Sequence, residues 1–294
     1  MPFFPLLQQS PQEFLDSALN KRGYSTKCYM TTNSGYRNAP TPLQLASYHV
    51  HILKMVVLDK DPHALLDMLA CGISPNACNK FGESLLHRVC NFGQDKLLKI
   101  FLDCSADIQI SDGAGRTPMH EVCRRPRPSF KTFELLLQQD SRLIHMQDTA
   151  GAAPLSFVRA DQYGAWNKFL ESILDTYWKP REASAGLQGP PPLALEKSNS
   201  RQVPDPDNAL PLELAALVSS GRMEPEEAIT TNNPAEDDED STWDDDDSSD
   251  SDDIDFDETE CNFDEKEFEE LQDLMNFGLS SRNKKEISLG RYFI

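Results

Sequence analysis

The sequence lacks the short motifs that mark most enzyme active sites. It contains no Walker-type phosphate loop, no Gly-x-Gly-x-x-Gly, no Gly-x-Ser-x-Gly elbow and no His-Glu-x-x-His. Paired zinc ligands and an aromatic ribonucleoprotein box, which would point to nucleic acid, are also missing. We therefore expect a protein that is not an enzyme, needs no cofactor or metal, and does not bind nucleic acid.

Long apolar runs and regularly paired cysteines are missing too. No uninterrupted apolar run approaches the roughly 18 residues needed to cross a bilayer, and the opening MPFFPLLQQS has no basic region of the signal-peptide kind. The seven cysteines are odd in number and scattered, which disfavours a disulfide framework. We expect a reduced, monomeric intracellular protein without membrane contact, in the cytoplasm, the nucleus or both.

The chain has a large net negative charge, and this excess is confined to one segment. The chain has 48 acidic and 28 basic residues, and residues 236–270 hold 21 of the acidic ones against a single lysine. So dense a run of like charge cannot bury a core, which predicts an acidic disordered tail over 236–263. Ser241, Thr242 and Ser249 each have an acidic residue three positions on, as acidophilic kinases prefer, and are candidate phosphorylation sites.

A period of 33 residues runs through the middle of the chain. FGESLLHRVC at 81–90 aligns with AGRTPMHEVC at 114–123, so that the glycines Gly82 and Gly115 and the histidines His87 and His120 recur 33 apart. Each copy is followed by a second apolar helical stripe, in DKLLKIFLD and FKTFELLLQQ. Turn, helix, turn, helix at this period predicts a stacked helical repeat.

These motifs resemble the ankyrin-repeat family. Its Thr-Pro-Leu-His motif is matched by TPMH at 117–120, TPLQ at 41–44 and SLLH at 84–87. The sequence around FGESLLHRVC also resembles uncharacterised diatom ankyrin-repeat proteins, a similarity that supplies no activity. The resemblance implies an all-α solenoid of about four helix-turn-helix units with short hairpin loops over residues 37–180. It gives structural roles to Thr41, Pro42, Ser84, His87, Thr117, Pro118 and His120.

The histidine and cysteine of each unit allow three interpretations: a metal site, a nucleophile with its base, or packing. His120 and Cys123 share a helix face. Successive helices are about 8 to 10 Å apart, too far for two such pairs to share a zinc ion with bonds of about 2.0 to 2.3 Å. Packing is the favoured interpretation, with cysteine as a small buried residue.

The repeats are irregular at both ends. Thr41 and Ser84 are 43 apart, so the first unit carries about ten additional residues around HVHILKMVVLDKD, in a lengthened helix or loop. Gly115 and Gly151 are 36 apart, with the excess in the basic run RRPRPS at 124–129. Atypical terminal units are expected in a solenoid, because their outer faces meet water or a cap.

Stacked repeats bind other proteins through an extended surface. The resemblance implies that this surface is the hairpin tips and the exposed side of the first helices, which are here Lys80, Phe81, Glu83, Arg88, Ala114, Arg116 and Glu121. Phe81 is either an interface anchor or a ring folded back on its own hairpin. The basic loop Arg124, Arg125 and Arg127 is either solvated or contacts an acidic partner, including the chain's own tail.

The flanks carry further predicted elements. In residues 1–36, Ser10, Pro11 and Glu13 indicate a helix start, and this helix is expected to cap the first repeat. Residues 181–235 are rich in proline and serine and are predicted to be a disordered linker, with one short helix over 209–221. Residues 264–294 hold a short amphipathic helix with an apolar side formed by Phe268, Leu271, Leu274 and Met275.

Two functions fit these features. The first is a non-catalytic protein-binding adaptor or scaffold in which the repeats hold a protein partner and the acidic tail regulates the interaction. The alternative is a nuclear acidic protein, either a transcriptional regulator or a chaperone for basic proteins, in which the tail acts and the repeats address it. Ankyrin surfaces are not a readable code, so the sequence does not identify the partner.

Overall fold

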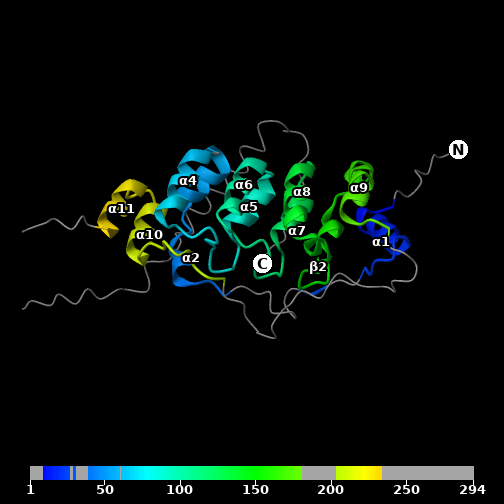
Figure 1. Cartoon of the computed structure of the whole chain (residues 1–294), viewed down its shortest axis with the longest axis horizontal. Coiled ribbons are helices and arrows are strands. Elements are labelled where there is room, and N and C mark those ends of the chain that lie inside the picture. The colour runs from blue at the N-terminus through cyan, green and yellow to red at the C-terminus, as the bar shows by residue number, and fades with distance from the viewer. Residues whose placement is uncertain (1–8, 27–28, 31–38, 60, 181–202, 234–294) are drawn as a thin grey trace, which may run out of the picture. The chain divides into compact units, whose positions relative to one another are not determined.

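The computed structural model describes residues 9–26, 29–30, 39–59, 61–180 and 203–233. All of them belong to one compact unit that ends at Asn233. Within this unit the helices stack side by side in a row (Figure 1). The predicted acidic tail and the amphipathic helix around Phe268 to Met275 lie outside the described residues.

Paired helices form the repeats. The central units are α5 with α6 and α7 with α8, and α5 packs on α7 as α6 does on α8. The last unit has two short 3-10 turns before its long helix. The bounds are Leu85–Phe92 (α5), Asp95–Asp103 (α6), Pro118–Cys123 (α7), Phe130–Gln139 (α8), Pro154–Phe157 (η3), Ala160–Gln162 (η4) and Tyr163–Tyr177 (α9). The predicted all-α ankyrin-type solenoid is confirmed.

A single short strand pair accompanies the helices in the described part of the chain. Tyr29–Met30 (β1) pairs in parallel with Met146–Gln147 (β2), which follows the 3-10 turn Ser141–His145 (η2). The pair ties the segment after the N-terminal helix to the loop before the last unit.

The additional residues of the first unit form helix rather than loop. After α2 (Pro42–Ala46) come α3 (Val50–Lys54) and a π-helical turn, η1 (Met55–Asp59), before α4 (Pro62–Cys71). The apolar residues of this insertion are buried, apart from Leu58. A run this apolar gains more from packing against α4 and α5 than from solvent exposure, which is why the insertion is absorbed into the stack.

The N-terminal helix α1 (Pro11–Lys21) has the predicted capping box between Ser10 and Glu13 but covers the other end of the stack. It packs on α9, at the last repeat (Figure 1). Arg22 pairs with Asp175 at 2.7 Å, and Leu15 and Leu19 are fully buried. The prediction that this helix caps the first repeat is therefore wrong. Both ends of a solenoid expose apolar surface that a helix can cover, and the sequence does not say which end it reaches.

The first repeat is covered instead by residues 203–233, which we call the return segment. It forms α10 (Leu212–Ser219) and α11 (Pro225–Asn232), which pack on α2 and α4 respectively. Figure 1 shows these helices beside α2 and α4, at the opposite end from α1 and α9. The prediction of a disordered linker over 181–235 is therefore wrong for the return segment. Its apolar residues, Val203, Leu210, Ala215, Val218 and Ala228, are buried on the stack, and this burial stabilises the docked helices.

Candidate protein-binding face

Three hairpin tips recur along one side of the stack, each built on an Asn or Asp side chain. In the second tip Asp112 Oδ1 accepts hydrogen bonds from the backbone N–H groups of Ala114 at 2.9 Å and Arg116 at 2.8 Å. Asn79 and Asp148 make the same two contacts in the first and third tips. These residues were not singled out from the sequence, although each lies three positions before a tip glycine, which is a recognisable turn signal.

The tips are joined to one another by backbone hydrogen bonds. The N–H of Gly113 donates to the carbonyl of Phe81 at 2.7 Å, and that of Thr149 donates to the carbonyl of Ala114 at 2.9 Å. Adjacent tips are therefore held in register, which gives a partner a fixed surface.

The motif histidines fasten each first helix to the following tip. Nδ1 of His87 accepts from the N–H of Ser84 at 3.2 Å, and its Nε2 donates to the carbonyl of Arg116 at 2.9 Å. His120 repeats this with Thr117 at 3.0 Å and Ala152 at 3.2 Å. Burial lowers the pKa of His120 to about 4, so its ring is neutral near pH 7 and suited to accept at one nitrogen and donate at the other.

The cysteines beside these histidines are packing residues. Cys90 and Cys123 are fully buried, and burial raises the pKa of both thiols. A thiol held protonated in this way is a poor nucleophile and a poor metal ligand. Within the described residues no group of His, Cys, Asp or Glu side chains could hold a metal ion.

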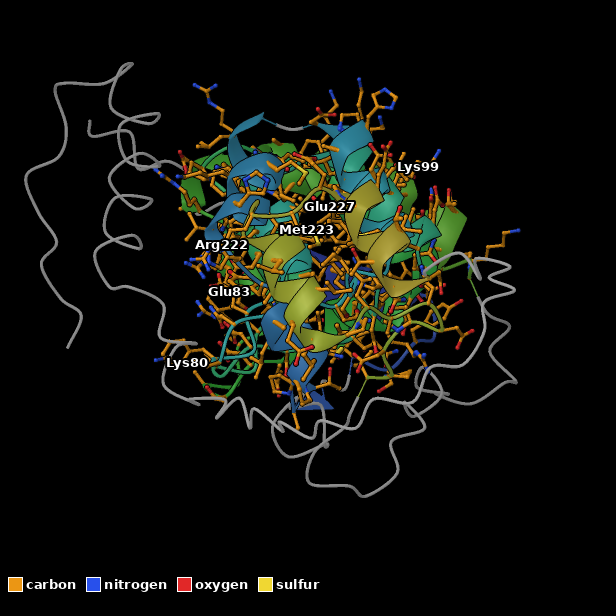
Figure 2. The ribbon with its side chains drawn as sticks, turned by 90° about the vertical axis from the view of Figure 1, so that its left-hand side faces the viewer. Lys80, Glu83, Lys99, Arg222, Met223 and Glu227 are labelled. Atoms are coloured by element: carbon orange, nitrogen blue, oxygen red, sulfur yellow. The ribbon has the colours of Figure 1, made fainter. Side chains whose placement is uncertain are left out.

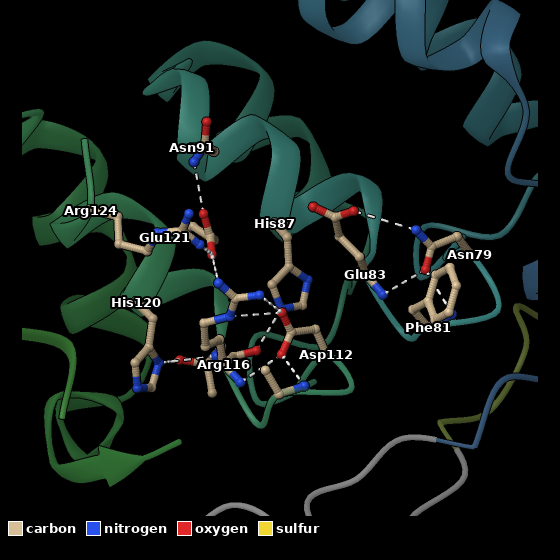
Figure 3. A network of polar contacts seen from close by, with 12 residues as sticks. Asn79, Phe81, Glu83, His87, Asn91, Asp112, Arg116, His120, Glu121 and Arg124 are labelled. Atoms are coloured by element: carbon tan, nitrogen blue, oxygen red, sulfur yellow. Dashed lines mark hydrogen bonds and ion pairs between the residues drawn. The ribbon is translucent and has the colours of Figure 1, made fainter. Parts of the chain in front are cut away.

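The first helices and tips together form a surface that we call the inner face, made of Glu83, Arg88, Asn91, Arg116, Glu121 and Arg124. Figure 3 labels these residues except Arg88. Glu121 is at the centre of this face. It accepts from Asn91 at 2.7 Å and from Arg124 at 2.8 Å, and Arg116 approaches it to 4.0 Å. Arg116 also pairs with Asp112 at 2.9 Å, and Arg88 pairs with Glu83 at 2.8 Å.

Arginines cover two buried carboxylates, Glu121 and Asp112, whereas Glu83 is more exposed than its partner Arg88, at 28% against 19%. The side chains of Glu121 and Asp112 are 9% exposed, whereas those of Arg116 and Arg124 are 29% and 39% exposed. Glu121, predicted as a contact residue, is therefore a buried anchor that positions arginines. Around Glu121 the inner face therefore shows a partner mostly guanidinium, a donor group that matches carboxylates in pairs.

The three arginines of the basic loop have different roles. Arg125 donates to the carbonyls of Asn91 and Arg127 and lies directly over Gly93, so it is half-buried and holds two repeats together. Gln162 donates to the carbonyl of Arg125 at 3.3 Å from the last unit. Arg124 and Arg127 are exposed and remain open to a partner.

Phe81 lies at the tip of the first hairpin and does not fold back on it. Its side chain is 65% exposed, more than any other large apolar residue in the described part of the chain. The ammonium of Lys80 is 5.4 Å from the centre of the ring, a cation–π distance. Of the predicted tip residues, Lys80 is exposed and Ala114 is half-buried.

A stack of short helix pairs with tied hairpin tips defines a repeat protein with an extended surface suited to binding. Comparison with known families agrees: residues 53–148 match the family model for ankyrin repeats in three copies. Residues 53–148 are therefore ankyrin repeats, which are a protein–protein interaction module. No helix in the described residues is long and apolar enough to cross a membrane.

Similar stretches occur in several other proteins. The chain is 31% identical over 98 residues to the neurogenic locus Notch protein of Drosophila melanogaster, covering 33% of this chain and 4% of that protein. It is 29% identical over 120 residues to the ADP-ribosylation factor GTPase-activating protein AGD4 of Arabidopsis thaliana, covering 41% and 15%. It is 37% identical over 67 residues to ankyrin repeat-containing protein P1E11.10 of Schizosaccharomyces pombe, covering 23% and 32%. In each case the alignment spans less than a third of the relative.

Replacing Glu121 by glutamine is expected to loosen the inner face. The amide oxygen can replace one acceptor but not the negative charge that holds Arg124, and hydrogen bonds to charged groups contribute about 1.5 to 3 kcal/mol. We expect a loss of about 1 to 2 kcal/mol in the free energy of unfolding, measured by urea titration. Glu171→Gln, at an exposed position on α9, is the control; equal effects of the two changes would contradict a central role for Glu121.

Proposed function

We propose that this protein is a non-catalytic adaptor that holds a protein partner on its inner face and hairpin tips. The observation that carries the proposal is the covering of Glu121 and Asp112 by arginines, together with an exposed Phe81 at the first hairpin tip. Aromatic and arginine side chains dominate the energetics of protein interfaces. The favoured partner segment has carboxylates for Arg124 and Arg127 and an apolar pocket for Phe81.

Affinity capture from native lysate with the full chain as bait tests this face. Phe81→Ala and the pair Arg124→Glu with Arg127→Glu should each reduce the recovery of the captured partner at least tenfold. Phe81→Ala should change the free energy of unfolding by less than about 0.5 kcal/mol, because the ring is mostly exposed.

The matched control reverses two charges on the other side of the stack. Lys96 and Lys99 are exposed on α6, and in the end-on view Lys99 lies on the opposite side from Lys80 and Glu83 (Figure 2). Lys96→Glu with Lys99→Glu should leave capture unchanged. Loss of capture in this control, with retention in the inner-face variants, would overturn the proposed binding face.

The acidic tail is proposed to regulate binding by competing for the same arginines. Residues 236–270 bear the entire net negative charge of the chain, and Arg124 and Arg127 are exposed cations, of which Arg124 also pairs with Glu121. Exposed charges are screened over about 8 Å at physiological ionic strength, so higher salt should weaken this contact. Guanidinium chemical shifts of Arg124 and Arg127 that respond to neither salt nor deletion of 236–270 would contradict it.

The concentration of charge in residues 236–270 also supports the second candidate, a nuclear acidic protein that regulates transcription or chaperones basic proteins. Capture of basic proteins that is lost on deleting 236–279 and unaffected by Phe81→Ala would favour it over the adaptor. The cytoplasm and the nucleus are both proposed locations.

A further inference from the structure

The return segment is bound to the stack through a small set of specific contacts. Its binding surface, which we call the first-repeat face, comprises Thr41, Gln44, Ala46, Ala70 and Gly72. Thr41 Oγ1 donates to the carboxylate of Asp205 at 2.7 Å, and the side-chain amide of Gln44 donates to the carbonyl of Val203 at 2.9 Å.

Three further contacts complete this docking. The hydroxyl of Ser219 donates to the carbonyl of Ala46 at 2.7 Å, and Asn208 donates to that of Ala70 at 2.9 Å. The N–H of Leu210 donates to the carbonyl of Gly72 at 3.2 Å. Every one of these bonds joins the return segment to the first repeat. None of them involves the last repeat, which precedes the return segment in the chain, so the docking site is formed by the first repeat.

The distance that the chain must cross is long for the number of residues available. Between α9 and α10 along the row lie α7 with α8, α5 with α6, and the first repeat, which is four layer steps of about 8 to 10 Å, or roughly 30 to 40 Å. Only 22 residues separate Pro180 from Val203. A chain of that length reaches at most about 75 Å, and an unconstrained one averages roughly 25 Å end to end.

The first-repeat face is therefore within reach of the chain's own return segment, but beyond the average of roughly 25 Å for a flexible Gly/Ser-type chain of that length. Stretching lowers the effective concentration of a tethered segment. A second copy of the chain presents the identical segment, and it makes the identical contacts without that stretch. Exchange of one element between two copies needs no new surface.

We propose that the first-repeat face binds the return segment of a second copy of this chain, so that two copies exchange residues 203–233 at high protein concentration. At low concentration the return segment docks on its own stack and the chain is a monomer. Each copy in the dimer donates one return segment and accepts one, which closes the assembly at two.

Altering the length of the connection tests the exchange. Deleting residues 186–199 leaves eight residues between Pro180 and Val203, with a reach of roughly 30 Å, so docking within one copy becomes unfavourable and exchange is favoured. The shortened full chain should be a dimer by light scattering after size exclusion. The matched control lengthens the connection instead: about 14 Gly and Ser residues, as many as are deleted in the shortened chain, are inserted at the same place in the unaltered chain. This lengthened chain should be a monomer.

Gly72→Ala tests whether the first-repeat face is the surface that binds the exchanged segment, because a Cβ at this position would lie 2.1 Å from the carbonyl oxygen of Asn208. In the shortened chain this change should abolish the dimer. A shortened chain that stays monomeric, or a dimer that survives Gly72→Ala, would overturn the proposal. The unaltered chain gives a second measurement: sedimentation should show a dimer that grows with concentration and is missing in Gly72→Ala, and a monomer throughout would also overturn exchange.

Discussion

Gly72→Ala is expected to release the return segment and to lower the free energy of unfolding by about 2 to 4 kcal/mol. Gly72 ends α4 with φ at +108°, a conformation that costs a residue with a side chain roughly 1 to 3 kcal/mol. The added Cβ would also lie 2.1 Å from the Asn208 oxygen and 3.0 Å from the Leu210 nitrogen. Both are backbone atoms, so no rotamer change relieves the overlap, and the segment must move away. Thermal unfolding and hydrogen exchange of α10 and α11 measure the two effects.

Gly151→Ala separates backbone strain from lost docking. Gly151 has φ at +81° in the third hairpin tip, and a Cβ there would meet no atom within 4 Å. This variant should lose only about 1 kcal/mol, the usual cost of giving a left-handed position a side chain, and α10 should keep its protection from exchange. If Gly72→Ala also left α10 protected, the first-repeat face would not depend on the close approach at Gly72.

The repeats themselves could be predicted because their signals are local. A capping residue, a histidine three positions on and a tip glycine recur at a fixed period, and each feature has its own physical reason to begin a helix or close a turn. In the structure Ser84 and Thr117 cap α5 and α7 in this way. Asn79, Asp112 and Asp148 carry a signal of the same kind, and aligning all three tips would have revealed it.

The short helix predicted over 209–221 agrees with α10, but the docking of the return segment on the first repeat was missed, because its sequence order differs from its place in the stack. PLELA at 211–215 repeats PLQLA at 42–46, and in the structure α10 packs directly on α2. A search for a constant period assumes that neighbours in sequence are neighbours in the stack. Here the chain passes from the last unit back to the first, so the motif lies after a proline-rich stretch where no repeat was expected. In the same way, α1 precedes the first repeat in the sequence but packs on the last one.

The character of the inner face also depends on tertiary structure. The sequence shows glutamates and arginines at first-helix positions, but not that Glu121 is buried and shared between Asn91 and Arg124. Likewise, nothing local distinguishes Arg125, which is held by the backbone of a neighbouring repeat, from Arg127, which is exposed. Pairing across repeats decides which charges are presented, and pairing depends on three-dimensional register.

Acidification is expected to destabilise the stack through two buried histidines. Burial lowers the pKa of His120 and of His145 to about 4, whereas an unfolded histidine has a pKa of about 6.5. Above pH 6.5 both states are neutral and the full stability is present. As the pH falls from about 6.5 to 4 the unfolded state binds protons that the folded state does not, so stability is lost. At about 1.4 kcal/mol per pKa unit, each histidine contributes roughly 3 kcal/mol of this loss by pH 4.

His145→Leu separates this effect from the titration of carboxylates. Nδ1 of His145 is buried without a hydrogen-bond partner in the structure, so leucine at this position removes a titrating group while breaking no bond at that nitrogen. The variant should match the original near pH 7 and be about 2 to 3 kcal/mol less sensitive to acid between pH 7 and 4, by urea titration at each pH. His63→Gln, on the exposed side of α4, should leave the profile unchanged. A His145→Leu profile that overlays the original would mean that His145 is protonated in the folded protein as readily as in the unfolded chain, and the acid sensitivity would then have to come from His120 and the carboxylates.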